Sequence, residues 1–378
     1  MIDVIIPVYG GVEQTRRCID SVLAQQQAAP HDVVVIDDAS PEPEIASYLD
    51  ALARQGRISL HRNESNLGFV RSVNLGMALH GDRDVVLLNS DTEVANDWLD
   101  RLRAAACGAA HIATATPFSN NATICSYPFE GWGGGVPGTL GLARVDRLFA
   151  TANAGRTLEL PTAIGFCMYI RRECLDQLGL FDAQRFGRGY GEENDFCMRA
   201  AKAGWRHVLA ADVFLYHEGS VSFSDERFEL IKAATAALLA VHPEYTSRVH
   251  EFIKADPAAE LRAAVDNARV AFGPEEARHV LAEHAQERGR LVNSMWEIVR
   301  LTAERETLAG QVNQLNYAVD HAMNVLADRD HSIAQLRAGL AYAESLAFSR
   351  EAELDSLRSN LLIRLYERLR RRFARSAP

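Results

Sequence analysis

The sequence predicts an α/β fold with a mixed, mostly parallel sheet, followed by an α-helical region and a long coiled coil. Over residues 4–115, short apolar runs of strand length alternate with amphipathic stretches of helical period. Strands that alternate with helices form βαβ units, whose strands pair in parallel. Beyond residue 290, apolar residues recur every seven positions instead, and this heptad spacing is typical of a coiled coil.

The apolar runs in the first part of the chain are expected to be strands, joined by amphipathic helices. Right-handed crossovers then bring the carboxyl ends of the strands to one edge of the sheet, where open α/β folds bind their ligands. The strands are expected at 4–7, 33–36, 58–61, 85–88 and 112–115, and the helices at 13–23, 42–53, 70–80 and 97–106.

Residues 116–160 are rich in Asn, Gly and Pro and are expected to be irregular. A long irregular stretch inside a compact domain is usually functional. Regular elements are expected to resume after it, with a strand at 163–170, a helix at 172–178, a helix at 193–203 and a strand at 213–216.

The heptad repeat runs from Leu291 to Leu361. One isolated helix cannot bury such a seam, so we expect the chain to form a homo-oligomer through it. Arg305 at position a, and Arg329 and Arg350 at position d, interrupt the seam and could set its register or strand number. The alternative is a long helix folded back on the first domain.

The end of the chain is basic and amphipathic. Arginines fill one helical face, and apolar residues fill the other, which predicts peripheral contact with an anionic membrane surface. The alternative is the solvated end of the coiled coil. The apolar residues are Leu362, Leu365, Tyr366, Leu369 and Phe373.

These changes of pattern divide the chain into four parts. We expect an α/β domain at 1–235, a helical linker region at 236–290, a coiled-coil oligomerisation segment at 291–361 and the basic amphipathic tail at 362–378.

Composition narrows the class of protein. The chain has 378 residues, 48% hydrophobic and 24% charged, with a net charge of -10, which argues against general nucleic-acid binding. The sequence contains no stretch near 18 consecutive apolar residues, so no transmembrane helix is expected. The N-terminal residues lack the basic region and cleavage site of a signal peptide. The six cysteines show no CxxC spacing, so we expect reduced thiols and no zinc site. These features predict a cytoplasmic protein, with peripheral contact at the inner face of the cell membrane through the tail.

The strongest single signal follows the expected strand at 85–88. Asn89-Ser90-Asp91 places a carboxylate at the carboxyl edge of the sheet. A lone aspartate there suits a divalent cation that carries phosphates. The alternative is that Asp91 caps the helix starting near Asn96.

Clusters of polar and glycine residues follow several of the expected strands and open one of the expected helices. The clusters are Pro7-Val8-Tyr9, Asp37-Asp38-Ala39-Ser40, Asn66-Leu67-Gly68-Phe69, Asn89-Ser90-Asp91 and Gly191-Glu192-Glu193-Asn194-Asp195-Phe196. In this order and spacing they resemble the family 2 glycosyltransferases, which are inverting nucleotide-sugar enzymes with the GT-A fold. The resemblance covers residues 1–225.

The resemblance implies a donor pocket. The main chain at Pro7 and Tyr9 would line the nucleotide, and the Tyr9 ring could stack on the base, unless it is simply packed. Asp38 would accept a hydrogen bond from the N3–H of uracil or thymine; the alternative is an Asx turn. Arg71 could pair with phosphate or a uridine carbonyl.

The resemblance also implies a metal site for Mg²⁺ or Mn²⁺. Asp91 would ligate the metal that bridges the diphosphate, and Ser90 would lie against the donor. His217 resembles the further metal ligand that many relatives place after a late strand; the alternative is a satisfied surface histidine. Asn89 replaces the family's first acid, which lowers the charge of the site.

Glu193 aligns with the family's general base, where the usual residue is Asp. Glu192, on the acceptor side, is its rival, and Asp195 is a third acid. Alternatively, all these acids decorate a helix N-terminus. Trp132, in its glycine-rich segment, could offer a platform for the acceptor sugar.

The resemblance therefore implies a metal-dependent inverting hexosyltransferase that uses a UDP- or dTDP-sugar. The segment 189–196 looks like that of rhamnosyltransferase-like members, which favours dTDP-rhamnose. The acceptor would be a growing cell-surface glycan such as a lipid-linked O-antigen polysaccharide. One alternative is a sugar nucleotidyltransferase, although only Gly10-Gly11 follow Tyr9 and no loop lysine is present. The other is a non-catalytic coiled-coil scaffold with a degenerate GT-A domain, which the Asn89 and Glu193 departures keep open.

Overall fold

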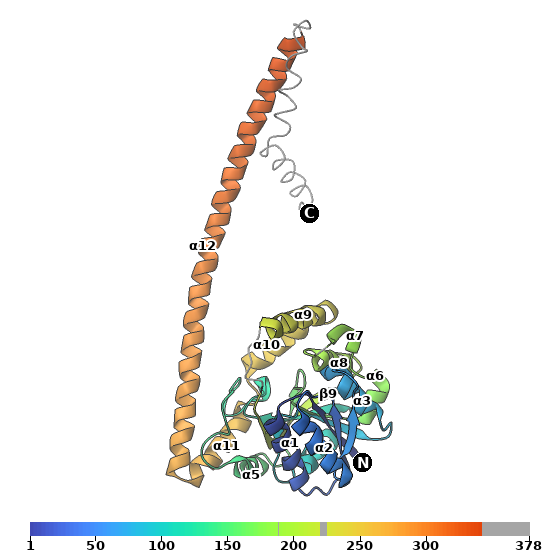
Figure 1. The fold of residues 1–378 in the computed structure, drawn as a ribbon. Coiled ribbons are helices and arrows are strands. Elements are labelled where there is room, and N and C mark those ends of the chain that lie inside the picture. The colour runs from blue at the N-terminus through green and yellow to red at the C-terminus, as the bar shows by residue number, and fades with distance from the viewer. Residues whose placement is uncertain (188, 220–224, 342–378) are drawn as a thin grey trace. The chain divides into compact units, whose positions relative to one another are not determined.

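A computed structural model describes residues 1–187, 189–219 and 225–341 of the chain (Figure 1). The chain divides into two units, Met1–Arg290 and Leu291–Pro378. The first holds the sheet and its helices, and the described part of the second continues one long helix. The functional division at 235, 290 and 361 stays a prediction, and the basic tail lies outside the described residues.

The first unit contains the mixed α/β fold that the sequence predicts. Its strands are β1 Ile2–Val8, β2 His31–Asp37, β3 Ser59–Arg62, β4 Asp84–Leu88, β5 Thr92–Glu93, β6 Ile112–Ser119, β7 Thr157–Leu160, β8 Cys167–Ile170 and β9 Arg206–His217. Its helices are α1 Val12–Ala24, α2 Pro43–Arg54, α3 Phe69–Ala78, α4 Trp98–Cys107, η1 Thr123–Cys125, α5 Leu142–Ala152, α6 Arg172–Leu178, α7 Ala183–Phe186, α8 Glu192–Lys202, α9 Asp225–Val241, α10 Tyr245–Ala255, α11 Ala259–Phe272 and the start of α12 Pro274–Ala341.

The strand order is β3-β2-β1-β4-β8-β6-β9-β5, with β7 added on β9. β1 pairs in parallel with β2 and β4, and β2 pairs in parallel with β3. β8 runs antiparallel between β4 and β6, which makes the sheet mixed. Because β1, β2 and β4 run in one direction, their carboxyl ends meet at a single edge, as the sequence predicts.

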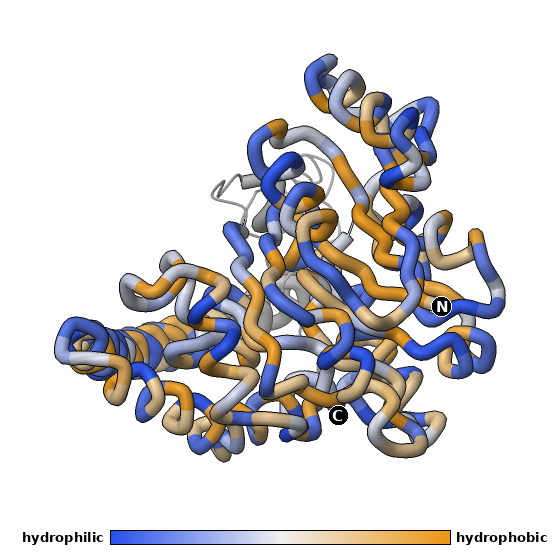
Figure 2. The backbone as a smooth tube through the Cα atoms, turned by 90° about the horizontal axis from the view of Figure 1, so that it is seen from below, coloured by the Kyte–Doolittle hydropathy of each residue, from blue (hydrophilic) through white to orange (hydrophobic). Residues whose placement is uncertain are grey.

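Helices cover both faces of the sheet and give it two hydrophobic cores. One core packs residues of α1, α2, α4 and α5, including Ile19, Trp98 and Phe149, against the strands. The other packs residues of α3, α6 and α8, including Met77 and Phe196. Figure 2 shows the hydrophobic strands running through the interior, with hydrophilic residues on the surrounding segments.

The expectation of an irregular stretch at 116–160 is wrong for its second half. α5 occupies 142–152 and β7 occupies 157–160. α5 forms because Val145 and Phe149 share a helical face and are fully buried. The late strand is also longer than expected, since β9 runs from Arg206 to His217, and β8 is shorter, starting at Cys167.

A buried charge cluster attaches α11 and the start of α12 to the sheet domain. The Arg269 guanidinium is fully buried and lies 3.0 Å from Glu276 and 2.6 Å from Glu283. It also donates to the Tyr127 hydroxyl at 3.1 Å, and that hydroxyl donates to Asp266 at 2.6 Å. Charges buried in this way stabilise a fold only while each keeps its partner.

Replacing Arg269 with methionine is therefore expected to destabilise the first unit strongly. The change leaves Glu276 and Glu283 buried without their cation, which typically costs about 3–5 kcal/mol. Urea unfolding followed by circular dichroism measures the loss. Arg300→Ala is the matched control, because Arg300 is 60% exposed beside Glu297 and Glu304 and should change stability by less than about 0.5 kcal/mol. A loss under about 1 kcal/mol for Arg269→Met would contradict this role.

α12 carries the predicted heptad seam into the second unit. Its apolar side chains are exposed in the single chain, among them Leu291, Leu308 and Leu315. The coiled coil itself stays a prediction. Across the described residues, no helix is both long and apolar enough to cross a membrane.

Candidate active site

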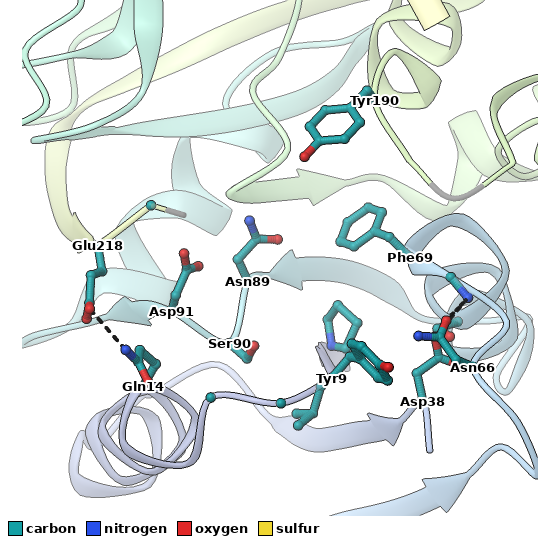
Figure 3. Close-up of a pocket in the computed structure, with 17 residues that line it drawn as sticks. Tyr9, Gln14, Asp38, Asn66, Phe69, Asn89, Ser90, Asp91, Tyr190 and Glu218 are labelled. Carbon is teal, nitrogen blue, oxygen red and sulfur yellow. Dashed lines mark hydrogen bonds between the residues drawn. The ribbon is translucent and has the colours of Figure 1, made fainter. Parts of the chain in front are cut away.

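A cavity of about 720 Å³ opens at the sheet edge where β1, β2 and β4 end (Figure 3). Tyr9 and Asp38, which follow β1 and β2, line one side of it. Ser90 and Asp91, which follow β4, line the other. Tyr190, just before α8, lies across the cavity from Tyr9. The volume falls within the range of small-molecule sites, roughly 300–1,000 Å³.

The end of β1 forms the floor of the cavity. Pro7 and Tyr9 both line it. The Tyr9 side chain is 57% exposed, so it is not packed in a core. An aromatic ring in this position can stack on a planar ligand.

Asp38 holds the loop that leads into α3. Asn63 Nδ2 and the Leu67 backbone N–H donate to its Oδ1, at 2.7 and 2.8 Å. The Gly68 backbone N–H donates to its Oδ2 at 2.8 Å. A carboxylate oxygen can accept two hydrogen bonds, so Oδ2 keeps capacity for one donor in the cavity.

Asp91 and His217 face each other, with 3.4 Å between Oδ1 and Nε2. β5 places Thr92 opposite His217 on β9, which brings the two strand ends together. The His217 ring stacks on Phe166 at 5.1 Å and 19°, and its Nδ1 lies 2.6 Å from the Asn121 carbonyl oxygen. Because a carbonyl oxygen only accepts, Nδ1 carries a proton. Nε2 faces Asp91 Oδ1, to which it donates when the ring is protonated; once that proton is lost, Nε2 can offer its lone pair to a cation.

The Asp91–His217 pair fits a divalent cation. Burial raises the pKa of the Asp91 carboxyl, but the hydrogen bond and charge of His217 and the Gly219 backbone N–H bring that pKa below its ordinary value. Two ligands at about 2.1 Å and at right angles around one ion are roughly 3 Å apart. Among the described residues, no group of three or more His, Cys, Asp or Glu side chains is arranged to hold a metal ion. Phosphate and water would therefore have to supply the remaining ligands.

Glu193 lies in the first turn of α8. Its carboxyl carbon is 3.7 Å from the position that a Cβ on Gly165 would take. Asn194 Nδ2 donates to Glu193 Oε1 at 3.0 Å. Burial raises the pKa of Glu193, and neighbouring N–H groups and the Asn194 amide offset part of that rise. Gly165 is followed by Phe166, whose ring stacks on His217. Glu193 therefore lies close to the segment that contacts the His217 ring.

Glu192 is buried, with 4% of its surface exposed. Its Oε2 has no hydrogen-bond partner among the described residues. Burial and then the charge of Glu193 raise the pKa of Glu192 well above its ordinary value. Asp195 is different, because Arg199 and His242 contact its two oxygens at 2.8 and 2.9 Å. These contacts indicate that Asp195 has a structural role, in which it joins α8 to His242.

The raised pKa of Glu192 has a consequence for stability. The folded state holds the Glu192 proton more tightly than the unfolded state, so this residue weakens folding as pH rises above the unfolded pKa of about 4.3. Glu192→Gln is therefore expected to raise Tm at about pH 8 by roughly 2–4 °C. The gain should shrink to nothing near pH 4, as calorimetry across pH would show. Glu159→Gln, at an exposed position, should change Tm equally at every pH; a pH-independent gain for Glu192→Gln would be contrary evidence.

Five predicted site residues are not among those that line the cavity: Arg71, Trp132, Glu192, Glu193 and His217. Arg71 is exposed on α3. Trp132 packs edge-on against Phe129 at 5.1 Å, and its indole N–H donates to the Gly135 carbonyl at 3.3 Å. Glu192 is buried next to Glu193 in the sequence. The roles of Arg71, Trp132 and Glu192 stay predictions.

The cavity also contains residues that the sequence did not single out. Glu218 lines it, and Gln14 Nε2 donates to Glu218 Oε1 at 3.1 Å. Arg17 pairs with Glu218 and, at 3.0 Å, with Glu93. The signal for Glu218 was its place directly after His217, at the end of the last strand.

Comparison with known proteins finds a family model that matches part of the first unit. Residues 3–179 match the family model described as glycosyl transferase family 2. This part of the chain is therefore similar to glycosyl transferase family 2 domains.

Individual relatives are distant. The chain is 22% identical over 240 residues to the uncharacterized protein y4gI of Sinorhizobium fredii, covering 60% of this chain and 25% of y4gI. The chain thus spans about a quarter of the length of that curated relative. Among solved structures, GalNAc-T7 with UDP, GalNAc and Mn²⁺ has a TM-score of 0.47 at 19% identity, over 65% of this chain and 51% of that chain. The mannosyltransferase PcManGT from Pyrobaculum calidifontis with GDP-Man and Mn²⁺ has a TM-score of 0.46 at 19% identity, over 75% and 79%.

Proposed function

We propose that the chain is a metal-dependent inverting glycosyltransferase that moves a hexose from a UDP- or dTDP-sugar, with dTDP-rhamnose as the favoured donor, to a growing cell-surface glycan. The observation that carries this proposal is the pairing of Asp91 with His217 beside the cavity that Asp38 and Tyr9 line. One end of the cavity suits a pyrimidine, and the other suits a cation-bound diphosphate.

The pyrimidine end is supported by Asp38 and Tyr9. The free capacity of Asp38 Oδ2 suits an N–H donor, and uracil and thymine present one at N3 whereas cytosine does not. The exposed Tyr9 ring offers a surface for the base. Both features favour UDP or dTDP over CDP.

The diphosphate end is supported by Asp91 and His217. The metal, Mg²⁺ or Mn²⁺, would stabilise negative charge on the departing diphosphate. Asp91 and His217 would hold it from one side, and Ser90, between Asn89 and Asp91 in the cavity wall, would lie against the donor.

Glu193 is the proposed base. The acceptor hydroxyl oxygen attacks the anomeric carbon, the bond from that carbon to the diphosphate oxygen breaks with inversion, and the hydroxyl proton passes to Glu193. The raised pKa of Glu193 makes its carboxylate a stronger base than an exposed glutamate.

A thermal-shift screen with Mn²⁺ tests the donor assignment. A nucleotide present at a hundred times its Kd stabilises the folded state by about 2.7 kcal/mol, so UDP or dTDP should raise Tm by several degrees more than CDP or GDP. Incubation with the matching sugar donor should release free nucleoside diphosphate. A larger shift with GDP would contradict the pyrimidine role, and pyrophosphate release would indicate a nucleotidyltransferase.

We also propose that the exposed seam of α12 joins copies of the chain. Light scattering should give a multiple of the chain mass, and the double change Leu308→Glu with Leu315→Glu should reduce it to one chain. Tyr317→Glu is the matched control, because Tyr317 is exposed but lies off the seam. A monomeric wild type would contradict the proposal.

For the tail at 362–378, we propose contact with anionic lipid at the cytoplasmic face of the membrane. Cosedimentation with phosphatidylglycerol vesicles should fall when the tail is removed. Equal cosedimentation with and without the tail would contradict it.

A further inference from the structure

Asn120, at the end of β6, uses its whole side chain to hold two segments together. It is 1% exposed. Its Oδ1 accepts from the His217 backbone N–H at 2.7 Å and from the Ser119 hydroxyl at 3.2 Å. Its Nδ2 donates to the His217 carbonyl at 2.9 Å and to the Gly134 carbonyl at 2.7 Å. All four hydrogen-bonding positions of the carboxamide are therefore occupied.

The identity of these partners fixes the orientation of the amide. A backbone N–H only donates, and a carbonyl oxygen only accepts, so Oδ1 must face His217 N and Nδ2 must face the two carbonyls. Asn120 thus closes a two-bond bridge on the main chain of His217, as a neighbouring strand would. The main chain at His217 is held where β9 leaves the sheet.

The ring of His217 is held by the adjacent residues. The Asn121 carbonyl accepts from Nδ1, and Phe166 stacks on one ring face. With its main chain and its ring both held, the imidazole keeps one tautomer and directs Nε2 at Asp91. The position of the Asn121 carbonyl depends on Asn120, which precedes it.

The same amide reaches the glycine-rich segment 131–135. Gly134 accepts from Asn120, and a Cβ at Gly134 would stand 2.4 Å from the Trp132 ring. The Asn120 side chain is therefore hydrogen-bonded both to this segment and to the main chain of His217.

We propose that Asn120 is a positioning residue, which sets the orientation and tautomer of His217 for a divalent cation and ties residues 131–135 to that ligand. The cation rests on the proposed function, whereas the tautomer of His217 does not. Side chains that orient a metal ligand typically contribute about 10–100-fold to metal affinity.

Asn120→Ala tests the proposal through two readouts other than activity. Titration of the protein with Mn²⁺ in the presence of UDP, followed by electron paramagnetic resonance, should show an affinity about 10–100-fold weaker than wild type. In metal-free protein, at a pH where the His217 ring is neutral, its ¹⁵N shifts should change from one Nδ1-protonated tautomer in wild type to a mixture in Asn120→Ala.

Asn74→Ala is the matched control. Asn74 bridges the main chain of Phe181 in the same way, with its Nδ2 donating to the carbonyl at 2.9 Å and its Oδ1 accepting from the N–H at 3.1 Å. It should lose comparable packing but leave Mn²⁺ affinity and the His217 tautomer unchanged. Folded Asn120→Ala protein with wild-type affinity and a single tautomer would overturn the inference.

Failure of the inference and failure of the proposed function give different results. If wild type binds Mn²⁺ and Asp91→Ala does not, but Asn120→Ala equals wild type, only the inference fails. If wild type binds no Mn²⁺, the proposed function fails, and the tautomer measurement still decides the part of Asn120. Should Asn120→Ala not fold, Ser119→Ala removes one bond to Oδ1, and it should weaken Mn²⁺ binding about threefold; no change there would overturn the inference.

Discussion

Glu193→Gln is expected to reduce the transfer rate by about 10²–10⁴-fold while leaving donor binding within a factor of two or so. Glutamine keeps the size of the side chain and the hydrogen bond partner Asn194, but it cannot take the acceptor proton. The loss should therefore appear in kcat, measured as nucleoside diphosphate released in the presence of acceptor, and not in the Kd for UDP.

Glu192→Gln is the control for that experiment, because Glu192 is the adjacent glutamate in the same first turn of α8 and is buried. Its rate should stay within about tenfold of wild type. The opposite ranking of the two variants would assign the base to Glu192. Equal rates for all three proteins would contradict base catalysis by this helix.

The pH dependence of the rate follows from the same residue. The base must be ionised, so kcat should rise with pH through the pKa of Glu193 in the complex. Burial raises that pKa, so the rise should lie above the ordinary glutamate value of about 4.3. Glu193→Asp should keep measurable activity, because aspartate also carries a carboxylate that can accept the proton.

Asp91→Ala is expected to abolish Mn²⁺-dependent activity and to weaken Mn²⁺ binding by at least about 100-fold. The change removes the ionised ligand and leaves His217 alone at the site. Isothermal titration with Mn²⁺ and UDP measures the binding. Asp97→Asn, at an exposed carboxylate on the edge of α4, should bind as wild type does. Metal-stimulated turnover in Asp91→Ala would show that the cation sits elsewhere.

Much of the first unit could be predicted because its elements have clear periods. The strands that became β1, β2, β3, β4 and β6 are short apolar runs, and their ends bring Tyr9, Asp38 and Asp91 to one edge. This geometry needs only the parallel pairing of neighbouring strands, which the sequence pattern predicts.

The rest depends on contacts between distant segments, which periodicity does not encode. Arginine is usually a surface residue, but Arg269 is fully buried. It is paired there with Glu276 and Glu283 of the next helix, α12. The sequence analysis did not predict α5, because the glycine-rich residues before it made the whole stretch look irregular. Trp132 packs against Phe129 of its own loop. The sequence pattern does not predict this contact, because it depends on the packing of the loop.

The same limit applies within the site. Strand ends predict the proposed metal ligand Asp91, but His217 is held by Asn120, Asn121 and Phe166, which lie on other segments. No spacing rule in the sequence joins these residues. The sequence left two roles open for Asp38, a hydrogen bond to the nucleobase or an Asx turn. Its carboxylate accepts from the backbone N–H groups of Leu67 and Gly68, a contact that the sequence did not predict.

The central claim is that Asp91 and His217 together hold the cation that carries the donor. Pulsed electron paramagnetic resonance of Mn²⁺ and UDP bound to protein with ¹⁵N-labelled histidine tests it most directly. A single ¹⁵N coupling should appear in wild type and vanish in His217→Gln. Bound Mn²⁺ without any histidine coupling, or with a coupling that survives His217→Gln, would contradict the claim.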